Sequence, residues 1–233
     1  MSLPTLSIPK YTLTIPSSKK VVQYRPFLVR EQKILLLAMN SDNEKEILSA
    51  MCEIIKNCVD GISNPEEIPI FDIEYIFMKI RAKSVGESVD VTIQCPKCQA
   101  KNNASVDLDS TSVIFDEKAT TKIMITDNIG VILNYPCLKD AALDIDSSSA
   151  DEIIHYIAKS INCVFDGDVV HTKKDFTTDE IIKFVESFTS GQMEKISYFY
   201  NHMPQLKKDI ECTCFSCKNE FKVSFEGLRD FFT

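Results

Sequence analysis

Residues 91–102 read VTIQCPKCQAKN, and residues 210–221 read IECTCFSCKNEF. Each stretch holds a Cys-x-x-Cys motif flanked by alternating apolar residues, which is typical of a strand that turns and returns. Zn²⁺ binds four thiolates in a tetrahedron, and a two-residue spacer lets both sulfurs of one tight turn reach the same ion. The two motifs therefore predict two halves of one zinc ribbon, separated in the chain by a long insertion.

The predicted metal ligands are Cys95, Cys98, Cys214 and Cys217. We interpret Cys212 as an apolar strand residue, because only Cys214 forms a Cys-x-x-Cys motif with Cys217. Four protein ligands leave no open position for a substrate or water, so the expected role of the Zn²⁺ cofactor is structural. The same ligands suit a rubredoxin-like iron centre, and free or disulfide-linked cysteines are the remaining alternative.

Two lysines lie beside the predicted site. Four thiolates and one Zn²⁺ sum to a charge of about −2, which Lys97 and Lys218 can offset locally. The residue after the second cysteine of such a turn is often Gly, because φ is positive there, but this chain has Gln99 and Lys218. The other cysteines are predicted to be small core residues: Cys52, Cys58, Cys137 and Cys163.

The composition indicates a soluble globular protein made in a reducing compartment. Nine cysteines is an odd number and disfavours a complete disulfide framework. Prolines at positions 4, 9 and 16 interrupt any signal-peptide core, and the longest apolar runs are too short for a membrane span. A net charge of −8 disfavours a general nucleic-acid binder, which needs a basic face.

We expect an α+β fold with helices and short antiparallel hairpins organised around the split zinc ribbon. The segments, expected to form one cooperative unit, are 1–28 as an N-terminal extended arm or edge strands, 29–85 as helical, 86–109 as the first zinc knuckle hairpin, 110–205 as an α/β insertion, and 206–233 as the second zinc knuckle hairpin with a C-terminal helical turn.

Local signals mark several element ends. Capping boxes at Ser149/Glu152 and Thr177/Glu180 predict two helix starts. Gly61 is expected to cap the helix before it, because a left-handed residue is favoured at that position. Two hairpin turns are predicted, one over 128–130, ending in Gly130, and one at Asp166-Gly167.

The sequence holds no recognisable catalytic constellation. There is no Gly-rich phosphate loop, and no Ser, Cys or His stands with partners that indicate an activated nucleophile. We therefore predict no catalytic residues, no small-molecule substrate and no enzyme activity. An enzyme whose site is assembled from scattered residues is the rival hypothesis, and it requires a deep pocket with perturbed acids.

Residues 68–98 read IPIFDIEYIFMKIRAKSVGESVDVTIQCPKC, an aromatic-rich amphipathic helix, a turn and a strand entering the first motif. This stretch resembles the baseplate hub and hub-assembly proteins of T4-like contractile-tailed bacteriophages. The resemblance implies a late viral assembly protein made in the host cytoplasm and working at the virion tail baseplate. It implies other hub and tail proteins as partners and no catalytic residues.

A zinc-ribbon nucleic-acid-binding module of a phage, of the transcription-factor type, is the alternative. Four lysines surround the predicted ribbon turns: Lys97, Lys101, Lys218 and Lys222. The net charge of −8 disfavours this alternative.

Overall fold

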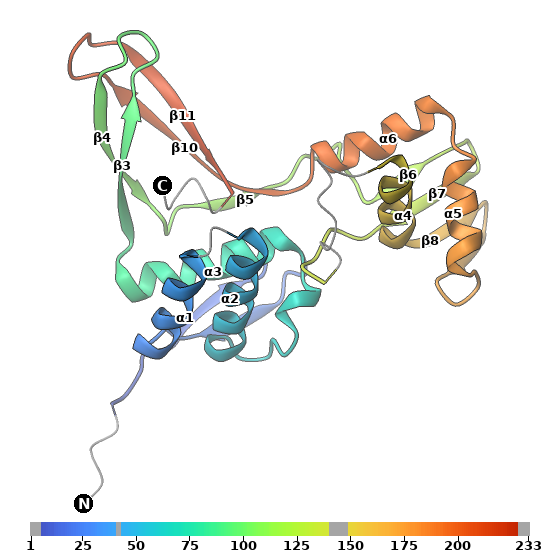
Figure 1. Ribbon diagram of the computed structural model, residues 1–233, viewed down its shortest axis with the longest axis horizontal. Coiled ribbons are helices and arrows are strands. Elements are labelled where there is room, and N and C mark those ends of the chain that lie inside the picture. Colours follow the sequence, from blue (N-terminus) through green and yellow to red (C-terminus); the bar gives the residue numbers. More distant parts are fainter. Residues whose placement is uncertain (1–5, 41–42, 140–148, 228–233) are drawn as a thin grey trace, which may run out of the picture. The chain divides into compact units, whose positions relative to one another are not determined.

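The computed structural model describes residues 6–40, 43–139 and 149–227 (Figure 1). Backbone contacts divide the chain into two compact units. Unit 1 contains the residues up to 114 together with those from 205 onward, and unit 2 contains residues 115–204. Helices and antiparallel strands occur in both units, which confirms the α+β class.

Unit 1 begins with a β-hairpin, three α-helices and a short 3₁₀-helix. These elements are β1 (Tyr11–Thr14), β2 (Val21–Tyr24), α1 (Val29–Met39), α2 (Glu44–Cys58), the short 3₁₀-helix η1 (Pro65–Glu67) and α3 (Ile70–Val85). Helices α2 and α3 supply eight of the most deeply buried side chains of the core: Met51, Ile54, Ile55, Ile73, Ile76, Phe77, Met78 and Ile80. Residues three and four apart share a helix face, which explains the buried stripe of α2. Helix α3 is buried on more than one face, because Ile76, Phe77 and Met78 are consecutive and all buried.

The expected glycine cap of α2 is wrong. The helix ends at Cys58, and Val59 is extended and forms a bridge with Tyr24. The amide of Asp60 donates to the Gln23 carbonyl at 2.8 Å, so the chain after α2 pairs with β2 instead of continuing into a helical cap. Gly61, with φ of +81°, serves the turn that follows this pairing.

Two long hairpins form the rest of unit 1, with a short strand beside one of them. These strands are β3 (Ser88–Gln94), β4 (Lys101–Asp107), β5 (Ser112–Ile114), β10 (Gln205–Thr213) and β11 (Glu220–Glu226). β3 pairs with β4, and β10 lies between β11 and β5. In Figure 1 the turns of the β3–β4 and β10–β11 hairpins lie side by side.

Three hairpin turns of unit 1 share one hydrogen-bond pattern. They span residues 15–20, 95–100 and 214–219. In each, the first residue's amide donates to the carbonyl of the sixth, and its carbonyl accepts from the amide of the fifth, at 2.8–3.0 Å. The fifth residue has positive φ in all three: Lys19 at +56°, Gln99 at +61° and Lys218 at +58°.

The first of these turns contains no cysteine. There the Ser17 amide donates to a carboxylate oxygen of Asp72 at 3.1 Å, and the Ser17 hydroxyl donates to the other oxygen. Asp72 belongs to α3 and is fully buried. A hydrogen-bonded carboxylate therefore fastens this turn, whereas the other two carry thiols.

Unit 2 is a four-stranded antiparallel sheet with three helices. The strand order is β6-β7-β8-β9. The elements are β6 (Lys122–Met124), β7 (Ile129–Leu133), α4 (Ala150–Ser160), β8 (Ile161–Asp166), β9 (Val169–Thr172), α5 (Thr178–Glu186) and α6 (Ser190–Asn201). Its core joins sheet and helix residues: Ile123, Ile125, Val131, Leu133, Ile157, Ala158, Ile161, Ile181, Val185, Ile196 and Phe199.

The capping boxes of unit 2 are confirmed. The Ser149 hydroxyl accepts from the Glu152 amide at the start of α4, and the Thr177 hydroxyl accepts from the Glu180 amide at the start of α5. Each glutamate accepts from the cap amide in return, at 2.7 Å. Local side chains alone therefore fix these two helix starts.

One predicted turn lies in the wrong place. The first hairpin turns over residues 125–128, and Gly130 is a residue of β7 paired with Met124. The Phe165 ring of β8 covers it, since a Cβ at Gly130 would lie 2.1 Å from the Phe165 Cζ. Gly130 therefore makes room for a ring. The turn at Asp166-Gly167 is confirmed, with Gly167 at φ of +57°.

The predicted C-terminal helical turn falls largely on residues 228–233, outside the described residues. None of the helices described here has the length and apolar character needed to cross a membrane.

Candidate metal centre

The four predicted ligands meet at the tips of the two long hairpins. The Sγ atoms of Cys95, Cys98, Cys214 and Cys217 all lie within 4.8 Å of one another. The Cys95–Cys217 separation is 3.7 Å and the Cys98–Cys214 separation is 3.6 Å. A tetrahedral site with zinc–sulfur bonds of about 2.3 Å has sulfur–sulfur edges of about 3.8 Å. The distances between the four sulfur atoms therefore fit a metal ion in tetrahedral coordination.

Each knuckle turn directs its own amides at its first cysteine. The N–H groups of Lys97 and Cys98 donate to Cys95 Sγ, and those of Ser216 and Cys217 donate to Cys214 Sγ. Such bonds stabilise a thiolate, which is the form that binds metal. The same local fold thus prepares one thiolate in each hairpin.

The pKa values show what four adjacent thiols do to one another. Backbone hydrogen bonds, first from the Cys217 amide, lower the pKa of Cys214 to about 6. At Cys98 a backbone bond from Ala100 favours the thiolate, but bonds to the Cys217, Cys214 and Cys95 thiols raise the pKa to about 12. Four thiolates at this spacing need a cation to offset their repulsion, and a divalent ion held by them would supply it.

Within each knuckle, the two cysteines differ in exposure. Cys95 and Cys214, the first cysteines of their turns, are 1% and 0% exposed, whereas Cys98 lies at the surface. The first cysteine in each pair therefore anchors the cluster inside the protein.

Asn102 links the two knuckles through a contact that the sequence did not reveal. Its side chain is 7% exposed, donates to the Ala100 carbonyl at 2.8 Å and accepts from the Phe215 amide at 2.9 Å. Polar groups around metal ligands commonly hold those ligands in position. Asn102 lies opposite Ile93 in the β3–β4 pair, and its side-chain oxygen reaches the second knuckle from there.

The remaining cysteines stay outside the cluster. Cys212 pairs across the hairpin with Phe221, and burial raises the pKa of its thiol. The other four are buried as expected: Cys52, Cys58, Cys137 and Cys163.

The lysines around the knuckles do not all remain unpaired. Lys97, Lys101 and Lys218 are exposed. Lys222 forms an ion pair with Asp209 at 2.8 Å on the neighbouring strand. The basic character expected around the ribbon is therefore reduced by one side chain.

Two open grooves lie elsewhere in the described chain. One of about 700 Å³ in unit 1 runs along β1 and α3, and one of about 410 Å³ in unit 2 lies between β6 and α6. Neither is lined by a Ser, Cys or His side chain. These grooves thus hold no nucleophile paired with a histidine base.

Comparison with known proteins gives one match. The family model described as "T4 bacteriophage base plate protein" matches residues 8–233. No curated protein and no solved structure matches the chain. The resemblance to T4-like phage baseplate proteins is thereby confirmed at the level of the family. Since the match covers nearly the whole length, the chain belongs to the T4 bacteriophage base plate protein family.

Proposed function

We propose that this chain is a structural or assembly component of the tail baseplate hub, acting by protein–protein binding and stabilised by one structural zinc ion. Membership of the base plate family supports the setting. The observation that carries the proposal is the cluster of four thiols within 4.8 Å, contributed by hairpins that lie before and after unit 2 in the sequence.

Such a site favours cohesion over chemistry. Four thiolates fill a tetrahedral shell, so a metal held by them has no position left for substrate or water. The ion would join the β3–β4 hairpin to the β10–β11 hairpin, and thereby join the two parts of unit 1. This arrangement supports a structural role for the proposed metal site.

The zinc part of the proposal is tested by metal analysis of purified protein. We expect one zinc per chain in the wild type and loss of that zinc in Cys95→Ser and Cys217→Ser. Cys212→Ser is the matched control, because Cys212 lies on the same hairpin outside the cluster and should keep its zinc. Stoichiometric iron in place of zinc would contradict the choice of metal.

The assembly part is tested by co-expression with the other baseplate hub proteins of the same phage, followed by co-purification. Wild type and Cys212→Ser should co-purify with a hub protein, whereas Cys95→Ser should not, because its ribbon is unfolded. A metal-free Cys95→Ser protein that still assembles would contradict the proposed role of the site. A wild-type protein that binds no hub protein would contradict the hub role itself.

Nucleic-acid binding is the second candidate, favoured by one observation. Lys97, Lys101 and Lys218 are exposed in or beside the knuckle turns, and Phe215 is 66% exposed at the tip of the second knuckle. Aromatic and basic side chains together can bind single strands. A retardation assay at several salt concentrations decides, because binding through these lysines should weaken steeply as salt rises.

A further inference from the structure

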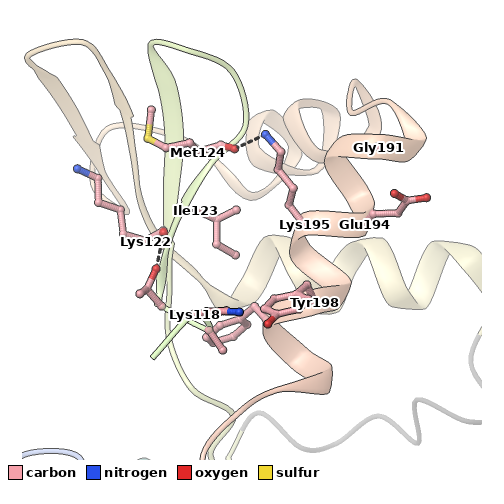
Figure 2. A pocket seen from close by; sticks show the side chains of 11 residues that line it. Lys118, Lys122, Ile123, Met124, Gly191, Glu194, Lys195 and Tyr198 are labelled. Atoms are coloured by element: carbon pink, nitrogen blue, oxygen red, sulfur yellow. Dashed lines mark hydrogen bonds between the residues drawn. The ribbon is translucent and has the colours of Figure 1, made fainter. Parts of the chain in front are cut away.

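Unit 2 contains a groove of about 410 Å³ that the metal centre does not use. β6 forms one wall and α6 the other (Figure 2). The residues that line it are Lys118, Ala119, Thr120, Lys122, Ile123, Met124, Gly191, Glu194, Lys195, Tyr198 and Phe199.

The wall formed by β6 is the edge of a sheet. The Leu133 amide donates to the Thr121 carbonyl and the Ile125 amide to the Ile129 carbonyl, both at 2.9 Å. Antiparallel pairing alternates, so the backbone groups of Lys122 and Met124 face away from β7 and along the groove.

The outward carbonyls of this edge are already occupied. The Lys122 carbonyl accepts from the Thr120 hydroxyl at 2.9 Å, and the Met124 carbonyl accepts from the Lys195 ammonium at 2.8 Å. The outward amides of Lys122 and Met124 have no acceptor among the described residues. The edge is therefore rich in donors, and a binding partner must bring acceptors.

The charges around the groove also favour a partner that brings acceptor groups. Its lining holds three lysines and one glutamate, in a chain whose net charge is −8. Within the described chain, none of Lys118, Lys122 and Lys195 forms an ion pair. Figure 2 shows Lys195 reaching from α6 to β6, while Glu194 points to the other side of its helix. Acidic groups on a partner would complement these lysines.

The floor of the groove is apolar. Ile123 and Phe199 are 8% and 1% exposed, and Tyr198 adds a partly exposed ring at 39%. Along β6, Ile123 faces α6, whereas Lys122 and Met124 project to the opposite face. A segment lying beside β6 would thus meet apolar surface on the α6 side and lysines at both faces.

We propose that this groove binds an acidic, extended segment of another protein. This inference rests on the proposed function, in which the chain acts by binding other proteins, and it names the chemistry of one partner. Carbonyls of the segment accept from the Lys122 and Met124 amides, its carboxylates pair with the lysines, and an apolar side chain covers Ile123. A second copy of β6 is a poor occupant, because it too offers donors and occupied carbonyls.

The test uses the full zinc-loaded chain and two capped octapeptides as probes, one alternating Asp and Val, the other alternating Asn and Val. We expect the Asp peptide to bind, with the Lys122 and Met124 amides among the largest shifts in nitrogen–proton correlation spectra. The Asn peptide should bind at least roughly tenfold more weakly, because it lacks the charges that pair with the lysines. Equal binding of both peptides, binding of neither, or shifts elsewhere would overturn the proposal.

Charge-reversal variants supply the matched control. Lys118→Glu with Lys122→Glu should weaken binding of the Asp peptide by at least roughly tenfold. Lys174→Glu with Lys183→Glu changes the net charge equally at exposed positions of unit 2 outside the groove and should bind as the wild type does. Equal loss in both pairs would overturn the proposal. So would a concentration-dependent dimer that only the groove variant abolishes, since the occupant would then be a second copy.

Co-purification with hub proteins separates this inference from the proposed function. If the wild type co-purifies with a hub protein but the Asp peptide does not bind the groove, the proposed function stands and this inference fails. If the peptide binds as expected but no hub protein co-purifies, the groove is supported and the hub role fails.

Discussion

Gln99 and Lys218 adopt a backbone conformation that residues with a Cβ rarely take, at φ of +61° and +58°. Glycine adopts this conformation without the steric cost, although its unfolded chain is more flexible. We expect Gln99→Gly to stabilise the zinc-bound protein by about 0.5–1 kcal/mol, because the relieved strain exceeds the entropic cost. Urea unfolding of both proteins measures this.

The matched control is Thr92→Gly, at an exposed position inside β3 where glycine should destabilise. Destabilisation by both substitutions would contradict the strain argument.

Asn102 joins the Ala100 carbonyl to the Phe215 amide, and thus one knuckle to the other. Asn102→Ala leaves both groups without this partner, so we expect zinc affinity to fall about 10- to 100-fold. Competition with a chromophoric chelator measures the affinity. Asn103→Ala is the control, because Asn103 lies on the exposed face of the same strand. Equal affinities of the two variants would show that Asn102 does not position the ligands.

Glu31 is 1% exposed at the start of α1. Burial alone would raise its pKa, but hydrogen bonds from Arg25, Arg30 and the Leu28 amide lower the pKa to about 2, from an ordinary value of 4.5. A lowered folded-state pKa means that Glu31 stabilises the protein above pH 4.5, and that this contribution is lost as pH falls towards 2.

Glu31→Gln should therefore cost about 3 kcal/mol at pH 7, and the difference from the wild type should shrink steadily below pH 4.5. Urea unfolding over a pH series measures this difference in unfolding free energy. Any loss of metal at low pH affects both proteins equally and therefore cancels in the difference. The exposed Glu53→Gln variant is the control. A difference that does not change with pH would contradict the ion-pair argument.

At the scale of elements, Gly130 of β7 leaves room for the ring of Phe165, its partner residue on the paired strand β8. Because a Cβ at Gly130 would lie 2.1 Å from Phe165 Cζ and 2.8 Å from the Ile123 carbonyl, Gly130→Ala must displace the ring. We expect a loss of about 1–3 kcal/mol in unfolding free energy. Gly191→Ala is the control, since nothing lies within 4 Å of that position in α6. Thermal unfolding compares them, and equal stability would mean that the ring moves freely.

The sequence predicted most helices and the hairpin strands of the ribbon because their signals are local. Ser149, Thr177 and their glutamates define helix starts within one turn. Gly61 and Gly130 were misplaced because their positions depend on long-range pairing, with β2 in one case and Phe165 in the other. Local patterns contain no information about those partners.

In the candidate site, too, the features set by local sequence were predictable and those set by long-range contacts were not. Cysteine spacing placed the four thiols, because each pair is fixed by its own turn. Asn102 depends on which strand lies beside which knuckle, and an isolated Asn carries no such signal. The groove between β6 and α6 was not foreseen either, since its lysines come from segments about 70 residues apart in sequence.

At the scale of the whole molecule, the two units should respond differently to loss of metal. The thiol cluster belongs to unit 1, and the core cluster of unit 2 contains residues of unit 2 alone. We therefore expect chelation to raise hydrogen exchange in β3, β4, β10 and β11 while the sheet of unit 2 keeps its protection. Such independent behaviour of the two units would differ from the single cooperative unit expected from the sequence.

Hydrogen exchange read by mass spectrometry, with and without a zinc chelator, makes this comparison. The Cys95→Ser protein should reproduce the pattern without chelator, and Cys212→Ser should resemble the wild type. If hydrogen exchange rises equally in both units, the chain unfolds as one cooperative unit. If it rises in neither, the metal does not stabilise the fold.

The order of the ligands along the chain has a consequence for synthesis. Cys98 leaves the ribosome about 120 residues before Cys217, an interval of roughly 6–24 s at bacterial elongation rates. All of unit 2 is made within that interval, so its sheet can form before the second knuckle exists. The proposed metal site therefore requires that the thiols of Cys95 and Cys98 stay reduced until the second knuckle has been made.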